Sequence, residues 1–227
     1  MNAIIHNFIT GFRTVNFNDV KGQLLANPST FLAIFGVLIL VFGFIKIRKV
    51  KLSTKMIAQI GIALALSSVL QIFRLYHFPE GGSVTLGSLV PIIIIAIVYG
   101  PEVGFLAGFL HGMITLILDP YILQPVQFLF DYPLPSMALG LAGYFGNKKV
   151  LGAVVAIFVK YIFHFLSGVI FFGSYAPKGM SPIIYSLTVN GSMMLIEGGI
   201  AVVIIALLPM DLIIKNIKQP IKSEALQ

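Results

Sequence analysis

The stretch VLGAVVAIFVKYIFHFLSGVIFF, Val150–Phe172, is apolar along almost its whole length and contains only two basic side chains, Lys160 and His164. A helix needs about 20 mostly apolar residues to cross roughly 30 Å of hydrocarbon, so this stretch predicts a transmembrane helix. The whole chain of 227 residues has this character, with 58% hydrophobic and 10% charged residues. Soluble domains carry about 25% charged residues, and backbone groups in lipid must pair within a helix. The sequence therefore predicts an all-α integral membrane protein.

Seven such stretches, bounded by charges, proline or glycine, indicate that the chain crosses the lipid bilayer seven times. The first is interpreted as an additional N-terminal transmembrane helix, because the basic segment Lys46–Lys55 separates it from a six-helix core. Besides Val150–Phe172, the stretches are Ser29–Ile45, Met56–Phe73, Ser83–Tyr99, Val103–Leu118, Leu123–Phe145 and Ile183–Pro209.

The chain is expected to divide into an N-terminal segment, residues 1–50, and a six-helix membrane domain, residues 51–227. The N-terminal segment contains the additional helix and, before it, apolar residues at a spacing that permits a short helix on the membrane surface. A tail without secondary structure fits that spacing equally well. The apolar residues concerned are Ile5, Phe8, Ile9 and Phe12.

The distribution of basic residues predicts the orientation in the cell membrane. Ten of the fifteen Lys and Arg residues fall on one side of the predicted spans and four on the other. Since cytoplasmic loops are enriched in Lys and Arg, the N-terminus is expected outside and the C-terminus in the cytoplasm. The net charge of +7 therefore reflects membrane topology, and no nucleic-acid partner is expected. The ten are Lys46, Arg48, Lys49, Lys51, Lys55, Lys148, Lys149, Lys215, Lys218 and Lys222.

The sequence argues against an enzyme. It has no cysteine for thiolate chemistry or metal binding, and it has no phosphate-binding loop and no segment outside the membrane large enough for an ATPase. No cofactor and no metal are expected, and any energy coupling must come from a partner. A distant alternative is an intramembrane enzyme that uses His164 with Asp131, or His111 with Glu102, although no metalloprotease or serine-hydrolase motif is present.

Ionisable groups inside membrane spans are costly and therefore indicate function. Asp131, His164 and the polar residue Asn190 each lie seven or eight residues from the outer end of their spans. With a rise of about 1.5 Å per residue, all three are expected roughly 10–12 Å below the outer surface. This common depth predicts a binding pocket open to the exterior. Lys160 and Glu197 lie deeper and form a candidate buried ion pair, although Lys160 can instead face Asp131.

One stripe of the Val150–Phe172 helix suits a flat ligand. Lys160, His164, Gly168 and Phe172 recur every four residues, so they share one face of the helix. Two rings separated by a residue without a side chain form a slot in which a planar aromatic molecule can stack. Close helix packing at Gly168 and a lipid-facing Phe172 are the plainer interpretation of either residue alone.

Two further patterns concern the backbone and the surface. Pro133 and Pro135 follow Asp131 closely and predict an irregular helix there, because proline removes backbone donors. Gly61 and Ala65 form a small-residue face, which serves either internal packing or docking to another membrane protein.

The segments YIFHFLSGVIFF (Tyr161–Phe172), YSLTVNG (Tyr185–Gly191) and QFLFDY (Gln127–Tyr132) resemble thiamine-specific substrate-binding (S) subunits of the energy-coupling-factor (ECF) vitamin importers. The resemblance covers roughly Ile57–Leu208 and leaves the first span outside. It implies a six-helix S-component fold that captures extracellular thiamine with high affinity. It also implies work with a transmembrane coupling (T) subunit and two cytoplasmic ATPases.

The same resemblance implies the binding residues. The acidic ligand residue falls on Asp131, and the stacking aromatics fall on His164 and Phe172. The coupling-subunit contact falls on Gly61 and Ala65. The full implied thiamine-binding set is Asp131, Tyr132, His164, Gly168, Phe172, Tyr185 and Asn190.

The chain departs from the family pattern in two places, since relatives tend to have glutamate at the position of Asp131 and tryptophan at that of Phe172. Tyr185 and Asn190 are also about 140° apart on an ideal helix, so both reach one ligand only near the helix end. An S subunit for another vitamin, such as riboflavin or biotin, or for a thiamine precursor, is the main alternative. A neutral ligand would not need Asp131.

Overall fold

The computed structural model describes residues 28–78 and 82–219. The predicted surface helix around Ile5–Phe12 lies outside these residues. In chain order, the elements are α3 (Pro28–Ile47), α4 (Thr54–Ile72), β1 (Arg74–His77), β2 (Ser83–Thr85), α5 (Val90–Tyr99), α6 (Pro101–Leu118), α7 (Pro125–Asp131), α8 (Pro133–Ala138), the 3₁₀ segment η2 (Leu139–Phe145), α9 (Lys149–Phe171), η3 (Gly173–Tyr175), α10 (Pro182–Leu207) and α11 (Met210–Lys218).

Five helices are long and apolar enough to cross a membrane among the described residues. They are α3, α4, α6, α9 and α10, and each corresponds to one predicted span. The multi-pass helical architecture is therefore confirmed. The two remaining predicted spans, Ser83–Tyr99 and Leu123–Phe145, are not single helices.

The predicted span Ser83–Tyr99 is wrong in its first half. Ser83–Thr85 pairs antiparallel with Arg74–His77, so this part is a β-hairpin arm. Gly87 has a φ of 97°, a conformation that suits glycine and ends the extended segment. Only the ten residues Val90–Tyr99 are helical, with proline at the start. Hydropathy alone could not reveal this, because strand pairing depends on a second segment on the other side of the turn.

The predicted span Leu123–Phe145 consists of three short pieces, α7, α8 and η2. The helix breaks at Tyr132, where φ is −119° and ψ is −77°. Pro133 and Pro135 cannot donate the backbone hydrogen bonds that would continue α7. The irregular backbone predicted beside Asp131 is thus confirmed, while the continuous helix is not.

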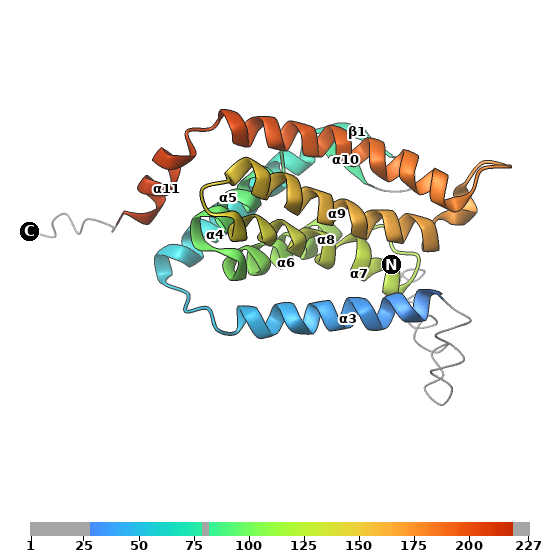
Figure 1. Cartoon of the computed structure of the whole chain (residues 1–227), viewed down its shortest axis with the longest axis horizontal. Coiled ribbons are helices and arrows are strands. Elements are labelled where there is room, and N and C mark those ends of the chain that lie inside the picture. The colour runs from blue at the N-terminus through green and yellow to red at the C-terminus, as the bar shows by residue number, and fades with distance from the viewer. Residues whose placement is uncertain (1–27, 79–81, 220–227) are drawn as a thin grey trace, which may run out of the picture.

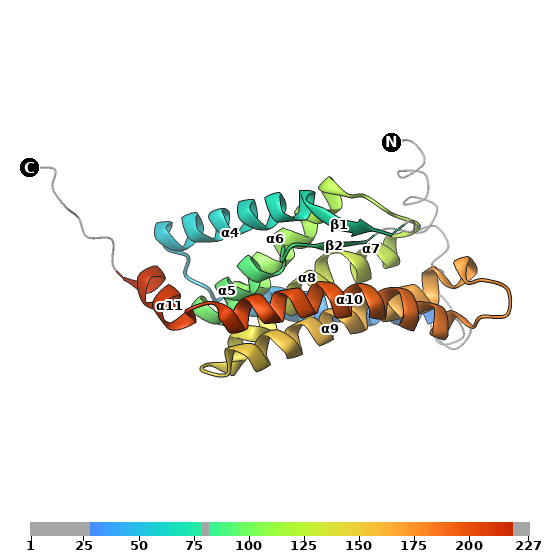
Figure 2. The same cartoon turned by 90° about the horizontal axis from the view of Figure 1, so that it is seen from above.

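The helices form a bundle elongated along one axis (Figure 1). Helices α9 and α10 run side by side, and α4 with the hairpin lies on the opposite side, with α5, α6 and α8 between them (Figure 2). A continuous apolar core joins α4, α5, α6, η2, α9 and α10. The α3–α4 link, the turn before α9, and α11 lie at the same end of the bundle (Figure 1). These segments and the adjoining helix ends contain nine of the ten basic residues expected in the cytoplasm, and Lys222 lies outside the described residues.

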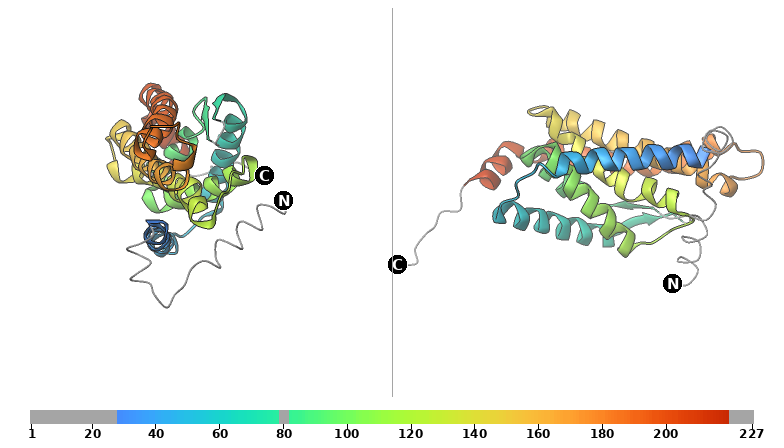
Figure 3. Two further views of the ribbon diagram at one scale, coloured as in Figure 1. Left: turned by 90° about the vertical axis from the view of Figure 1, so that its right-hand side faces the viewer. Right: turned by 90° about the horizontal axis from the view of Figure 1, so that it is seen from below.

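The additional helix α3 lies outside the bundle and covers the broken segment α7–α8 (Figure 3). Leu32 is 3% exposed and packs in one apolar cluster with Phe130 and Leu134. A Cβ on Gly36 would lie 2.8 Å from the Phe130 ring, so Gly36 leaves room for this ring against α3. Helix α3 therefore shields the irregular backbone next to Asp131, which lipid could not hydrogen-bond.

Candidate ligand-binding site

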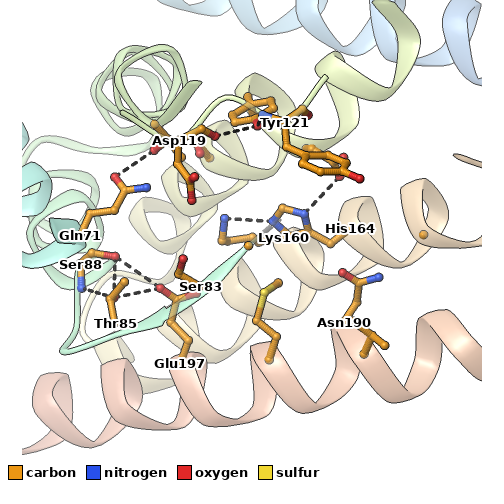
Figure 4. Close-up of a pocket in the computed structure, with 18 of the residues that line it drawn as sticks. Gln71, Ser83, Thr85, Ser88, Asp119, Tyr121, Lys160, His164, Asn190 and Glu197 are labelled. Atoms are coloured by element: carbon orange, nitrogen blue, oxygen red, sulfur yellow. Dashed lines mark hydrogen bonds and ion pairs between the residues drawn. The ribbon is translucent and has the colours of Figure 1, made fainter. Parts of the chain in front are cut away.

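A cavity opens between β2, α6, the α7–α8 break, α9 and α10 (Figure 4). The space between its lining atoms, including the open mouth, is about 990 Å³. All seven residues predicted to bind thiamine line it: Asp131, Tyr132, His164, Gly168, Phe172, Tyr185 and Asn190. Residues from distant parts of the sequence, among them Asp131, His164 and Asn190, therefore meet around one space.

A hydrogen-bonded chain of three ionisable side chains forms one wall of the cavity. Lys160 Nζ lies 3.2 Å from His164 Nε2, and His164 Nδ1 lies 3.4 Å from Asp131 Oδ1 (Figure 4). Because the ammonium group can only donate, Nε2 accepts and Nδ1 carries the proton that is donated to Asp131. The His164 ring is therefore neutral in this arrangement, and its face is available for stacking.

Asp131 is oriented by Gln127, one helical turn earlier on α7. Gln127 Nε2 donates to Asp131 Oδ2 at 2.5 Å, and Gln127 Oε1 accepts from Leu123 N at 2.9 Å. Gln127 is 1% exposed, so its amide is held firmly. Sequence reasoning missed this residue, although the spacing of four from Asp131 on a helix would have indicated it.

The proposed Lys160–Glu197 ion pair is not formed. Among the described residues, the ion pairs within 4.0 Å do not include Lys160, and its close polar partner is His164. Glu197 Oε1 instead lies 3.0 Å from Thr85 Oγ1 and 3.3 Å from Ser88 Oγ. The hairpin and the turn after it supply these hydroxyls. Their arrival depends on strand pairing, which the sequence pattern did not predict.

Gly168 allows α9 and α10 to approach at the cavity wall. A Cβ there would overlap Ser186 Oγ and Asn190 Nδ2. Asn190 Nδ2 donates to Ser186 Oγ at 3.1 Å, and the Ser186 hydroxyl donates to the Phe165 carbonyl at 2.8 Å. Gly168 therefore shapes the wall by making room for the Asn190 amide.

The cavity mouth carries a cluster of aromatic rings. Phe172 stacks on Tyr121 with ring centroids 5.8 Å apart and planes at 27°, and Tyr175 lies 6.0 Å from Phe172. Tyr121 lies in the loop between α6 and α7, where no periodicity marks it as a site residue, so the sequence analysis missed it. The cluster lies near the connection from α9 to α10, at the end of the bundle away from the basic segments (Figure 1).

The Tyr132 hydroxyl is bonded to the loop before α7. It accepts from Tyr121 N at 2.6 Å and donates to the Asp119 carbonyl at 3.0 Å. Tyr132 therefore anchors this loop with its hydroxyl and offers mainly its ring to the cavity. Asp119 also pairs with Arg74 and His77 of the hairpin, at 3.2 Å each, so the loop and the hairpin are joined at the mouth.

Gly61 and Ala65 lie on α4, away from the cavity. Both are exposed, and a Cβ on Gly61 would have no atom within 4 Å. The small-residue face is therefore not used for packing inside the described part of the chain.

The fold and the cavity define a class: a multi-pass helical membrane protein with an internal site for a small molecule. A family model described as "Thiamine transporter protein (Thia_YuaJ)" matches residues 57–216. The chain belongs to this family, whose role is transport and not catalysis. The helix α3 precedes the matched region.

Named relatives agree with this membership. The thiamine transporter ThiT of Bacillus subtilis is 32% identical over 169 residues, covering 66% of this chain and 88% of that protein. The thiamine transporter ThiT of Lacticaseibacillus paracasei is 34% identical over 140 residues, covering 53% of this chain and 70% of that protein. A solved structure of ThiT from Listeria monocytogenes superposes with a TM-score of 0.61 at 23% identity, covering 71% of this chain and 93% of that one. This structural similarity supports the fold alone.

Proposed function

We propose that this protein captures thiamine from the exterior as the S subunit of an ECF-type importer. The single observation that carries the proposal is the half-buried carboxylate of Asp131, held by Gln127 and His164 in a cavity with aromatic rings at its mouth. Thiamine is a permanent cation with two flat rings. A chain of net charge +7 attracts such a cation only through a local carboxylate.

The site residues have complementary roles toward the two rings of thiamine. Asp131 compensates the thiazolium charge, and the faces of His164 and Phe172 supply stacking and cation–π contact. A neutral His164 is required, because a second positive charge would repel the thiazolium. Asn190 and Tyr185 hydrogen-bond the aminopyrimidine from α10.

Delivery to the cytoplasm requires partners. The exposed face around Gly61 and Ala65 is the docking site for a T subunit, which works with two cytoplasmic ATPases. In this arrangement, the end of the bundle with the basic segments is cytoplasmic, the N-terminus is outside, and residues 51–227 form the binding domain. The cavity mouth then faces the exterior.

A calorimetric titration of the purified chain tests this function. Thiamine is expected to bind without ATP or metal, and the thiamine-like cation pyrithiamine is expected to compete. Riboflavin and biotin, which lack the positive charge, should not compete. Binding of a neutral vitamin with no heat from thiamine would overturn the proposal in favour of another vitamin.

A further inference from the structure

Phe130 connects the additional helix α3 with the cavity wall. It lies on α7 directly before Asp131, is fully buried, and does not line the cavity. Its ring packs edge-on against Phe163 of α9, with ring centroids 5.7 Å apart and planes at 62°. From α3, a Cβ on Gly36 would lie 2.8 Å from the ring atom Cε2 and 3.4 Å from Cζ. The Phe130 ring therefore occupies the space that a side chain at position 36 would need.

The buried positions of α3 form one face that is fitted to the broken helix. They are Leu32, Gly36 and Gly43, which share a face because about 3.6 residues make one helical turn. Leu32 packs in the same apolar cluster as Phe130. A Cβ on Gly43 would lie 2.5 Å from the Met137 methyl group. Helix α3 thus contacts α7 and α8 closely along this face (Figure 3).

Two neighbouring pairs of residues join α7 to α9. Phe130 contacts Phe163 in the apolar cluster, and the residues that follow them, Asp131 and His164, lie 3.4 Å apart at the cavity wall. Successive residues on a helix point about 100° apart, so the ring contact lies away from the cavity while the polar contact faces it. Because Phe130 and Asp131 are adjacent on one backbone, a displacement of the ring also displaces the carboxylate.

Helix α7 has little structure of its own to resist such a displacement. It is seven residues long and ends where the backbone breaks at Tyr132, and helices this short are not stable without packing. Its main packing partners are α3, α8 and α9. Gln127, which orients Asp131, lies on α7 itself and moves with it. The position of the carboxylate therefore depends on how α3 and α9 hold the Phe130 ring.

We propose that α3 positions the ligand-binding carboxylate. Gly36 seats the Phe130 ring against Phe163, and this contact holds Asp131 close to the positive charge of the ligand. Gly36 and Phe130 are positioning residues, since neither lines the cavity. The inference rests on the proposed function and deepens it. It gives α3, which precedes the region that the family model matches, a role in ligand affinity.

The test compares two ligands in the full-length chain: thiamine, and a neutral analogue in which carbon replaces the charged ring nitrogen. Gly36→Leu places a side chain where the Phe130 ring lies, so the ring and Asp131 must shift. For charges about 4 Å apart, a retreat by about 1 Å lowers affinity about fourfold at an effective dielectric constant near 20. Calorimetry should show thiamine weakened by about this factor and the neutral analogue nearly unaffected. Gly36→Ala should give a smaller loss in the same direction, and it serves as the test variant if Gly36→Leu does not fold.

Two combined variants show whether the effect acts through Asp131 and Phe130. In an Asp131→Asn chain, adding Gly36→Leu should cause no further loss of thiamine relative to the analogue, because no carboxylate remains to be displaced. Phe130→Leu should recover part of the loss in Gly36→Ala, because leucine lacks Cε2 and Cζ, the ring atoms closest to position 36. Leu38→Phe is the matched control. Leu38 is 61% exposed on the outer face of α3, so a larger side chain there should change neither affinity.

The outcomes are distinct. A thiamine-to-analogue affinity ratio that falls in the Gly36 variants and not in Leu38→Phe supports the inference. An unchanged ratio, whether both affinities hold or both drop together, overturns it and leaves thiamine binding intact as the proposed function. A selective loss that persists in the Asp131→Asn chain, or one that Phe130→Leu does not reduce, also overturns it. Absence of thiamine binding in the unmodified chain refutes the proposed function and the inference with it.

Discussion

Replacing Asp131 by asparagine removes the charge at the centre of the proposed site and leaves its shape nearly unchanged. The asparagine oxygen can still accept from Gln127 or His164, which now contact Asp131 at 2.5 and 3.4 Å. The loss is therefore mainly electrostatic. Two unit charges about 4 Å apart interact by about 4 kcal/mol at an effective dielectric constant near 20. Solvent at the open mouth reduces this value, so we expect a loss of at least tenfold and at most about a thousandfold in affinity.

The assay is a calorimetric titration of the unmodified chain and Asp131→Asn with two ligands. One is thiamine, and the other is a neutral analogue in which carbon replaces the charged ring nitrogen. Asp131→Asn should weaken thiamine by the factor above and leave the neutral analogue nearly unaffected. Asp119→Asn is the matched control, because Asp119 also lines the cavity but is already paired with Arg74 at 3.2 Å. Its effect on thiamine should be smaller.

Two results would refute the electrostatic argument. One is unaltered thiamine affinity in Asp131→Asn. The other is an equal loss for the charged and the neutral ligand, since that pattern would mean that Asp131 acts through the shape of the site.

Three further variants test other parts of the protein. Gly61→Leu should bind thiamine normally but lose uptake when assayed with the partner subunits, because it alters only an exposed face of α4; normal uptake would contradict the docking role. Gly168→Ala should displace the Asn190 amide, which lowers thiamine affinity, and destabilise the fold by roughly 1–3 kcal/mol. Titration measures the affinity and thermal unfolding the stability; an unchanged affinity would show that Gly168 does not shape the binding site through Asn190. Phe172→Trp should tighten thiamine binding a few-fold, because tryptophan gives the strongest cation–π contact. Since the chain has no other tryptophan, the fluorescence of this residue should be quenched by thiamine, and a spectrum insensitive to saturating thiamine would place residue 172 outside the site.

Much of the architecture was predictable because the length of an apolar run is a local property. The five long helices correspond to five of the seven predicted stretches. The break beside Asp131 was also predictable, since Pro133 and Pro135 act on their own backbone. The predicted span Ser83–Tyr99 was wrong in its first half for the opposite reason, because strand pairing involves a second segment. Ser83–Thr85 directly precedes an apolar run in the sequence, yet it pairs with Arg74–His77.

The candidate site divides in the same way. Position along each span was enough to predict that Asp131, His164 and Asn190 line one cavity, because rise per residue is nearly constant in helices. Their partners were not predictable. Gln127 orients Asp131, Tyr121 stacks on Phe172, and Lys160 contacts His164 and not Glu197.

The sequence by itself determined that this chain spans a membrane, roughly where it does so, and how far along each span its polar residues lie. Hydropathy, proline and helical rise act within one segment, so no other segment is needed to evaluate them. Only the tertiary structure decided which side chains meet. Those contacts depend on how each helix is rotated about its axis and on where the hairpin and the broken helix α7–α8 pack. Both are set by the packing of all segments together.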